Sequence, residues 1–290
     1  MKGKTCVITG ASDGIGFETA RRLGALGARL VLVGHNPTKG EAALARLRVQ
    51  CPGLLIEMLN ADLSVRSEVV RIASALLRAA PRIDVLVNNA GAFFARRAVT
   101  PDGLERTFAL NHMGYFLLSE LLLERLIASA PARIVNVASE AHRKAVLDFD
   151  DLQCANGYNG WKAYQRSKLC NVLFTRVLAG RLSGTGVAAN CLHPGFVSSS
   201  FGDNNPGLFR FGIGLAKRFS AISVARGAET PVYLASSPAV DGVTGRYFDK
   251  TRERVPSLAA QDDTAAARLW DESRRLAGLP PDSQSPHVRG

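Results

Sequence analysis

The feature that most constrains the fold of this chain is a regular alternation of short apolar runs with longer amphipathic stretches. Each run is rich in β-branched residues and is bounded by turn-forming residues, as in TCVIT at 5–9 and ARLVLVG at 28–34. Such runs are typical of strands that are buried on both faces of a parallel sheet. Four further runs of this kind occur at 54–63, 83–91, 132–139 and 187–195.

The stretches between the runs carry apolar residues three and four positions apart, which predicts helices. Repeated strand–helix units give a parallel sheet with helices on both faces, and right-handed crossovers bring the carboxyl ends of the strands to one ligand-binding edge. We therefore predict an α/β, doubly wound parallel sheet of about seven strands in a single domain. The domain is expected to span residues 1–278, with helices at 16–26, 40–49, 66–79, 103–129 and 161–183.

The last third of the chain interrupts this alternation. Residues 198–224 are punctuated by glycine and carry Phe201, Phe209, Phe211 and Phe219. After the carboxyl end of a strand, such a segment predicts a mobile lid over an apolar substrate, with a surface loop held down by its phenylalanines as the alternative. The segment 251–278 is expected to be helical and either to serve an interface or to pack on the sheet. The polar tail 279–290 is expected to be disordered.

The chain is strongly basic, with a formal net charge of +11. A basic protein can favour an anionic cofactor, a membrane surface or a nucleic acid, but an arginine-rich solvated surface explains the charge equally simply and is the interpretation we favour. No long basic run is interleaved with aromatic residues, so we expect no nucleic-acid partner.

The cysteine pattern and the hydropathy of the chain indicate the cellular compartment in which the protein is expected. The five cysteines form no CxxC pair, which predicts free thiols in a reducing environment and no metal site. No apolar run reaches the roughly 18 residues that a membrane span needs. The first residues, MKGKTCVITG, pass directly into a strand, so we expect no signal peptide and a cytoplasmic protein. Weak contact with a membrane surface is the alternative.

A glycine-rich turn, TGASDGIG at 9–16, directly follows the first strand and opens the first helix. Its glycines allow the backbone to turn tightly and to approach a pyrophosphate, which would lie at the positive end of the helix. The spacing differs from the GxGxxG fingerprint, but the strand–turn–helix context is the required one. The turn predicts cofactor contacts from Gly10, Ser12, Asp13, Gly14, Ile15 and Gly16.

Polar residues follow two further strands at the same predicted edge of the sheet. Asp62 and Leu63 end the run at 54–63, and Asn88-Asn89-Ala90-Gly91 ends the run at 83–91. Both are candidate cofactor contacts, because ligands bind at the carboxyl ends of parallel strands. Asp62 is equally well interpreted as a helix N-cap, and the NNAG run as an Asx-type turn.

The most specific chemical signal is AYQRSK, in which Tyr164 and Lys168 lie on one face of a helix. A free phenol has a pKa near about 10, and a nearby ammonium stabilises the phenolate and brings the pKa toward a useful range. Ser139 ends the strand ARIVNVAS, where its hydroxyl can meet a substrate oxygen, and Asn111 lies in the helical run ALNHMGYFLL. A Tyr-xxx-Lys pair alone is usually structural, but these four residues in one strand–helix chain indicate a catalytic site.

Together these motifs resemble the short-chain dehydrogenase/reductase family over residues 3–250. The resemblance rests on TGASDGIG, NNAG, Asn111, Ser139, the Tyr164-xxx-Lys168 pair and HPG at 193–195. The string AYQRSKLCNVLFTRVLAGRL, the following HPGFVSS and the long interval between Ser139 and Tyr164 are similar to the retinol dehydrogenase and protochlorophyllide reductase-like branch. The family implies a Rossmann fold and a nicotinamide dinucleotide cofactor.

The resemblance implies a role for each of the four residues. Tyr164 is expected to be the general acid in carbonyl reduction and the base in alcohol oxidation. Ser139 is expected to hold the carbonyl oxygen, and Lys168 to lower the pKa of Tyr164 and bind the nicotinamide ribose. Asn111 is expected to hold a water in a proton relay to Lys168.

The same resemblance distributes cofactor contacts along the edge of the sheet. It places Asp62 at the adenine, Asn89 at the adenosine-side ribose and Pro194-Gly195 at the nicotinamide end. The expected contacts beyond the glycine turn are Asp62, Leu63, Asn89, Ala90, Gly91, Tyr164, Lys168, Pro194, Gly195, Val197 and Ser199.

The end of the second strand indicates which dinucleotide is used. An acidic side chain there would bind the ribose of NAD, but this chain has Gly34, His35 and Asn36. Relatives that use NADP commonly carry arginine at the position of His35, and Lys39 can reach the same phosphate. Asp13 in the glycine turn argues the other way, because a carboxylate repels a phosphate. We predict NADP(H), with use of both dinucleotides, NAD(H) included, as the alternative. The alternative interpretation of His35 is a solvated turn residue.

The expected activity is an NAD(P)-dependent interconversion of a lipophilic alcohol and its aldehyde or ketone by hydride transfer. The alternative is a non-catalytic dinucleotide sensor or interaction protein on the same fold. Such a protein has no need of the four residues together. His112, His142 and His193 are interpreted as structural, because no proton-transfer step is left for them. Members of the family are often dimers or tetramers, so a homo-oligomer is an open expectation.

Overall fold

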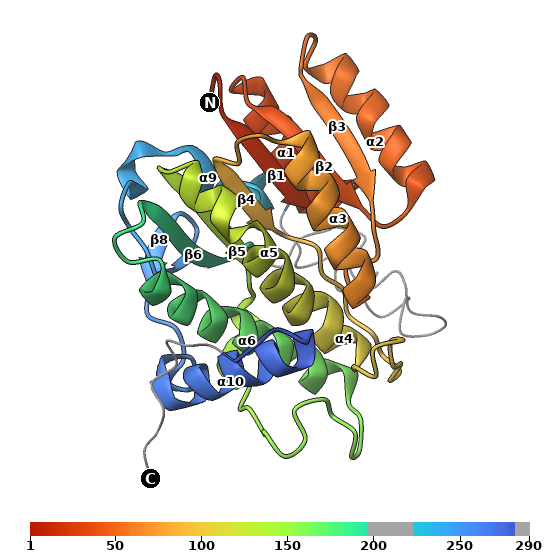
Figure 1. Ribbon diagram of the computed structural model, residues 1–290, viewed down its shortest axis with the longest axis vertical. Helices are drawn as coiled ribbons and strands as arrows, with labels where there is room; N and C mark the ends of the chain where they lie inside the picture. The colour runs from red at the N-terminus through yellow and green to blue at the C-terminus, as the bar shows by residue number, and fades with distance from the viewer. Residues whose placement is uncertain (196–222, 282–290) are drawn as a thin grey trace.

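One eight-stranded sheet forms the centre of the protein (Figure 1). The structure is a computed structural model and describes residues 1–195 and 223–281. The strands lie in the order β3-β2-β1-β4-β5-β6-β7-β8, and all neighbours are parallel except β7 and β8. They are β1 Thr5–Thr9, β2 Arg29–Gly34, β3 Ile56–Asn60, β4 Val85–Asn88, β5 Ala132–Val137, β6 Val187–His193, β7 Tyr247–Asp249 and β8 Arg252–Arg254.

Helices cover both faces of this sheet, which confirms the predicted doubly wound Rossmann fold. In Figure 1, α3, α5 and α6 lie on the near face, and α10 lies across α6. The α-helices are α1 Gly14–Ala25, α2 Pro37–Gln50, α3 Arg66–Ala79, α4 Arg106–Phe108, α5 Gly114–Ala128, α6 Gly160–Arg181, α8 Val224–Gly227, α9 Glu229–Ser236 and α10 Asp263–Ala277. Shorter turns of other types are the π-helix η1 Ala109–Met113 and the 3₁₀ helices η2 Glu140–Lys144, η3 Pro238–Val240 and η4 Leu258–Gln261.

The core has two layers because side chains alternate across each strand. In β1, Val7 packs into the layer beneath α3, α5 and α6, whereas Cys6 and Ile8 pack into the layer beneath α1, α2 and α9. All three side chains are fully buried, as expected for a strand that is covered on both faces.

The strand order reverses between β1 and β4, and this reversal positions the site. Chain connections leave β1 toward β2 on one side and β4 toward β5 on the other. A crevice therefore opens at the carboxyl ends of these strands, where α/β proteins of this topology bind ligands.

A β-hairpin at the edge of the sheet corrects the prediction for the C-terminal segment. The prediction expected helix throughout 251–278, but β7 and β8 form an antiparallel pair joined by Lys250 and Thr251, both at positive φ. A turn of this kind usually carries Asn-Gly or Asp-Gly, and neither pair is present. The strand β8 reads Arg-Glu-Arg and is exposed, so it has no hydrophobic signal either.

The remainder of that segment packs on the helix layer and not on the sheet. The helix α10 is buried against α6 through Leu269 and Trp270, and Trp270 contacts the rings of Phe116 and Phe174. Its Ser273 hydroxyl lies 2.8 Å from Nε2 of the fully buried His112.

Two predictions fall wholly or mostly outside the described residues. Of the predicted lid, 198–224, the structure describes only Ser223 and the beginning of α8. Of the predicted disordered tail, it describes only 279–281. Within the described ranges, none of the helices combines the length and apolar character that crossing a bilayer requires, and all five cysteines are free thiols.

Candidate active site

The glycine turn brings the backbone of β1 and the beginning of α1 into close contact. A Cβ on Gly16 would lie 2.3 Å from the carbonyl oxygen of Gly10, and a Cβ on Gly10 would lie 2.8 Å from Cα of Ala90. Only glycine fits at either position. Asp13 is the N-cap of α1 and accepts a hydrogen bond from N–H of Gly14 at 2.7 Å. The first turn of α1 faces the crevice, which Asp13, Gly14 and Ile15 line.

The Asn89 side chain holds this turn against the end of β4. Its amide donates to the carbonyl oxygens of Thr9 (2.9 Å) and Gly10 (3.2 Å). The Thr9 hydroxyl in turn accepts the backbone N–H groups of Asn89 and Ala90. The NNAG run therefore braces the glycine turn, whereas its first member, Asn88, points into the core and donates to Ser119 and Asn136.

Charged side chains gather around Asp62 at the far end of the crevice. One carboxylate oxygen of Asp62 accepts from the hydroxyl and the N–H of Ser64, and the other lies 3.9 Å from Nδ1 of His35 and 4.0 Å from a guanidinium nitrogen of Arg106. Burial opposes ionisation of Asp62, but the two Ser64 hydrogen bonds, together with His35 and Arg106, outweigh it and lower the pKa of Asp62. Sequence reasoning missed Arg106, which carries no motif signal.

Asn36 has a structural task at this end of the crevice. Its side-chain oxygen accepts the N–H of Lys39 at 3.0 Å, which makes it the N-cap of α2, and Pro37 follows at the first helical position. This cap fixes the turn that presents His35 and Lys39 to the crevice.

A π-helix presents Asn111 at the catalytic end. The predicted helix 103–129 begins only at Arg106, and it widens to η1 between α4 and α5. Such π turns are frequent at functional sites. Asn111 is fully buried; its oxygen accepts the N–H of Ala92, and its amide donates to the carbonyl of Ala92 and the hydroxyl of Ser167. Three hydrogen bonds, two to Ala92 and one to Ser167, therefore fix the position of the Asn111 side chain.

Gly91 leaves open the space between Asn111 and Lys168. A Cβ on Gly91 would lie 3.2 Å from the side-chain oxygen of Asn111 and 3.4 Å from Nζ of Lys168. The two polar groups therefore flank one small space at the end of β4, which is the arrangement that a water-mediated relay requires.

Tyr164 and Lys168 lie together on the buried face of α6, as the i, i+4 spacing predicts. Lys168 donates from Nζ to the carbonyl oxygen of Val137 at 2.9 Å, and its Nζ lies 5.8 Å from the centre of the Tyr164 ring. Ser139 follows β5, and its hydroxyl caps η2 by accepting the N–H of Ala141.

The pKa directions at this pair differ from the expectation. Burial raises the pKa of Tyr164 to about 12, and a hydrogen bond with the Ser139 side chain acts in the opposite direction without reversing the shift. Burial also lowers the pKa of Lys168 to about 7. The reason is that removal from water disfavours both charged forms more strongly than the pair stabilises them across this separation.

Aromatic rings form a wall beside Tyr164. Trp161 stacks on its ring with centroids 5.6 Å apart, and Phe93 approaches it edge-on at 6.4 Å. Trp161 and Phe94 line the crevice. These residues were missed because single aromatic residues, Trp161 in the first turn of α6 and Phe93 and Phe94 in the loop after β4, have no distinctive spacing.

One cleft of about 1040 Å³ joins the glycine turn, the Asp62 cluster and the Tyr164 pair. This volume is at the upper end of small-molecule sites, so it has room for a dinucleotide and a second ligand. Most of the predicted residues in the described ranges line it. Gly16 and Asn111 lie behind its wall, and Val197 and Ser199 lie outside the described residues. The lining residues that were predicted are Gly10, Ser12, Asp13, Gly14, Ile15, His35, Asn36, Lys39, Asp62, Leu63, Asn89, Ala90, Gly91, Ser139, Tyr164, Lys168, Pro194 and Gly195.

The cleft fits a nicotinamide dinucleotide. The closely packed glycine turn and the beginning of α1 can receive a pyrophosphate. Polar groups that can bind two ribose rings lie on either side of this turn, with Asp62 at one end of the cleft and Tyr164 and Lys168 at the other. In residues 1–195 and 223–281, no three His, Cys, Asp or Glu side chains are grouped as a metal site would need. The fold and this cleft define the class of dinucleotide-binding α/β oxidoreductases.

Comparison with known proteins identifies the family within that class. The family model for short chain dehydrogenase matches residues 4–206. Retinol dehydrogenase 14 of Homo sapiens is 41% identical over 298 residues, covering 96% of this chain and 88% of that protein. The chain therefore belongs to the short chain dehydrogenase family, as its motifs predicted, and its similarity to a retinol dehydrogenase confirms the predicted branch.

Solved structures agree with this assignment. An uncharacterized protein from Mycobacterium paratuberculosis superposes with a TM-score of 0.78 at 32% identity, covering 97% of this chain and 96% of the other. The Pseudomonas aeruginosa RhlG/NADP active-site complex superposes with a TM-score of 0.68 at 26% identity, covering 86% and 94%.

Proposed function

We propose that this oxidoreductase uses NADP(H) to interconvert a lipophilic alcohol and its carbonyl compound, with Tyr164 as the general acid and base. The observation that carries the proposal is the joining of Ser139, Tyr164 and Lys168 to the glycine turn by one cleft. A sensor protein would need the turn but would have no use for a buried Tyr–Lys pair.

Tyr164 is suited to donate a proton in carbonyl reduction. Because burial raises its pKa to about 12, the phenol is protonated at neutral pH, and the protonated form is the one that donates. The Ser139 hydroxyl, in hydrogen-bond contact with Tyr164, would hold the carbonyl oxygen, and Lys168 and Asn111 would return a proton through the space beside Gly91. The bound nicotinamide supplies the hydride.

The preference for NADP(H) rests on the charges at the Asp62 end of the cleft. The strand β2 ends in Gly34 and therefore presents no carboxylate to a ribose. His35, Lys39 and Arg106 all line the cleft there. The Asp62 carboxylate is already engaged by Ser64 and lies beside the imidazole of His35 and the guanidinium of Arg106, so it opposes a phosphate less than a solitary acid would. One of the solved relatives, RhlG of Pseudomonas aeruginosa, forms an active-site complex with NADP.

The substrate class rests on the aromatic wall. Trp161 and Phe94 line the cleft beside Tyr164, which favours an apolar or conjugated substrate. The similarity to a retinol dehydrogenase supports retinol and retinal as the first substrates to test.

The test is a comparison of dissociation constants for NADPH and NADH in the wild type, His35→Ala and Arg48→Ala. Arg48 is exposed on the far end of α2 and does not line the cleft, so it controls for loss of general positive charge. We expect NADPH to bind at least about tenfold more tightly, which is about 1.4 kcal/mol, and only His35→Ala to reduce that margin. Equal or tighter binding of NADH contradicts the NADP(H) proposal. If the protein binds neither NADPH nor NADH, the proposed oxidoreductase activity is contradicted.

A further inference from the structure

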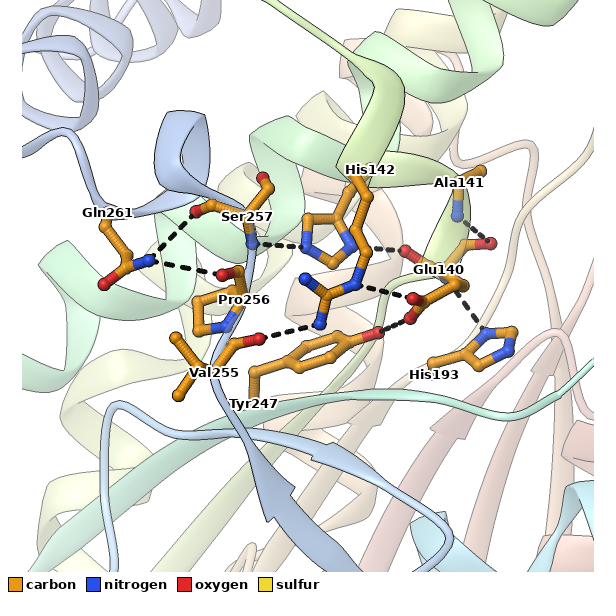
Figure 2. A network of polar contacts seen from close by, with 11 residues as sticks. Glu140, Ala141, His142, His193, Tyr247, Val255, Pro256, Ser257 and Gln261 are labelled. Carbon is orange, nitrogen blue, oxygen red and sulfur yellow. Dashed lines mark hydrogen bonds and ion pairs between the residues drawn. The ribbon is translucent and has the colours of Figure 1, made fainter.

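Two imidazoles hold the peptide group that follows Ser139. His142 donates from Nδ1 to the carbonyl oxygen of Ser139 at 2.7 Å. The N–H of Glu140, the other polar group of the same peptide, donates to Nδ1 of His193 at 3.1 Å (Figure 2). The two rings come from different elements, η2 and the end of β6, and they grip the peptide from its two ends.

Each of these hydrogen bonds requires one tautomer of its ring. A carbonyl oxygen only accepts, so the proton of His142 is on Nδ1, and its Nε2 accepts the N–H of Ser257 at 3.2 Å. A backbone N–H only donates, so Nδ1 of His193 carries no proton and the ring is protonated on Nε2. Both rings are therefore in defined neutral forms.

We call the pair of His142 and His193 rings, hydrogen-bonded to the peptide between Ser139 and Glu140, the clamp. The clamp is anchored to the C-terminal segment, whose role the sequence left open. Ser257 belongs to the link between β8 and η4, and the neighbouring Val255 carbonyl accepts from Arg143 at 2.7 Å. On the other side the Tyr247 hydroxyl of β7 donates to the Glu140 carboxylate at 3.0 Å (Figure 2). The C-terminal segment thus holds the His142 ring through Ser257, whereas Tyr247 reaches only the side chain of Glu140 and not the peptide that follows Ser139.

We propose that His142 and His193 are positioning residues for Ser139, and that they hold its hydroxyl against Tyr164 only while both rings are neutral. This inference rests on the proposed function of Ser139. A second proton on His193 would oppose the N–H of Glu140, and a second proton on His142 would oppose the N–H of Ser257. At His193 a donor would then face a donor, and the peptide would be released on that side. At His142 the Nδ1–H bond to the Ser139 carbonyl would remain, but the ring would lose Ser257, which anchors it to the C-terminal segment.

The surroundings of His142 keep its ring neutral at neutral pH. Burial lowers the pKa of His142. The hydrogen bond to Ser139 and the charge of Glu140 act to raise it, whereas Arg143 lowers it further. The Tyr247 ring packs edge-on against the imidazole, with centroids 4.9 Å apart, and brings no charge in the acidic range.

The surroundings of His193 have the same net effect. Burial lowers its pKa, the charges of Asp249 and Glu140 raise it, and His142 and Lys250 lower it. Because both folded-state pKa values are depressed, the clamp is intact at neutral pH and is lost as pH falls through them. An acid limb in the pH profile of kcat is the expected consequence.

The first experiment reads the tautomers directly and needs no substrate. The chain has five histidines, so long-range ¹H–¹⁵N correlation spectra of protein labelled in its imidazoles can be assigned by single substitution. We expect His142 to be protonated on Nδ1 only and His193 on Nε2 only at neutral pH. The opposite tautomer at either ring, or a doubly protonated ring, overturns the clamp.

The second experiment compares leucine and asparagine at each position, with retinal and NADPH as the assay. Leucine fills the space without a hydrogen bond, whereas the asparagine amide can donate at 142 and its oxygen can accept at 193. We expect His142→Leu and His193→Leu to lower kcat by about tenfold or more, because small displacements of a catalytic group are costly. We expect both asparagine variants to recover most of this loss and to move the acid limb to lower pH.

Tyr247→Phe is the matched control, because it deletes a hydrogen bond of the same network without touching the clamped peptide. It should lower thermal stability while leaving kcat within about twofold. Equal losses of kcat in the leucine and asparagine variants, or in Tyr247→Phe, contradict the proposal. If the wild type reduces no carbonyl compound, the proposed function fails, and the tautomers alone decide whether the clamp exists.

Discussion

The two ends of the cleft differ in how their polar side chains are held. At the catalytic end, Asn111, Lys168 and Tyr164 expose 0%, 4% and 8% of their surfaces, and Asn111 and Lys168 each make a hydrogen bond of 2.9 Å to the backbone. At the adenosine end, the side chains of His35 and Arg106 are 68% and 41% exposed, and they lie about 4 Å from Asp62.

This difference indicates which end of the cleft governs the reaction rate and which end governs the affinity for the cofactor. Buried polar groups have one arrangement, since leaving them unpaired is costly, and a single arrangement is what proton transfer requires. Exposed charges interact through solvent and tolerate substitution, so they adjust the affinity for a cofactor without deciding whether a reaction occurs. Substitutions at the catalytic end should therefore have large effects on rate, and those at the adenosine end should have modest effects on binding.

The largest effect is expected for Tyr164→Phe. Removing the phenol hydroxyl removes the proton donor, so kcat for retinal reduction should fall by at least about a thousandfold. The dissociation constant of NADPH should change by no more than about threefold, because the ring remains to fill its place beside Trp161. Tyr233→Phe, on α9, should change neither quantity. Residual turnover close to that of the wild type would exclude Tyr164 as the acid.

Lys168→Met should separate activity from stability. We expect a large loss of kcat together with a gain of roughly 2 kcal/mol in the free energy of unfolding near neutral pH, because the buried ammonium is removed. The folded pKa of about 7 lies below the usual 10.5 of lysine, so between these values the unfolded wild type binds more protons and its stability rises with pH. The advantage of the variant should be greatest below about pH 7 and should shrink as pH rises.

Urea unfolding across this pH range measures the effect, with Lys162→Met as the control. Lys162 is exposed on the same helix, so its substitution should leave activity unchanged and give no pH-dependent difference. A variant of Lys168 that is less stable than the wild type at every pH would show that the hydrogen bond to Val137 outweighs the burial of charge.

The smallest effect is expected at the adenosine end, from Asn36→Ala. Losing the cap of α2 should lower the free energy of unfolding by about 1 kcal/mol, and Asn36→Ser should restore most of it. The affinity for NADPH should change by less than about threefold. A loss of NADPH affinity much larger than the loss of stability would assign Asn36 a direct contact with the cofactor.

The sequence predicts the buried end of the cleft better than the exposed end. Tyr164 and Lys168 were placed correctly because a helix fixes i and i+4 on one face, and Ser139 because parallel strands end at one edge. The glycine turn was predicted from its strand–turn–helix context. Each of these rests on local geometry that the backbone dictates.

Features that depend on distant partners were not predicted. Nothing near Arg106 in the chain indicates that it faces Asp62, and the two imidazoles that hold the Ser139 peptide were interpreted only as structural. The shifted pKa values of Tyr164 and Lys168 depend on how completely the two side chains are buried, which spacing does not report. The β7–β8 hairpin was missed because neither its turn nor its exposed strand carries the usual residues.

The packing of α10 on α6 has a consequence for spectroscopy. The chain has two tryptophans: Trp161 is half exposed beside Tyr164 in the cleft, whereas Trp270 is buried where α10 packs on α6, against the rings of Phe116 and Phe174. One indole is therefore open to a quencher that enters the cleft, and the other is shielded until α10 detaches. Intrinsic fluorescence of the unmodified protein thus carries two separable signals, one for occupancy of the cleft and one for attachment of the C-terminal helix.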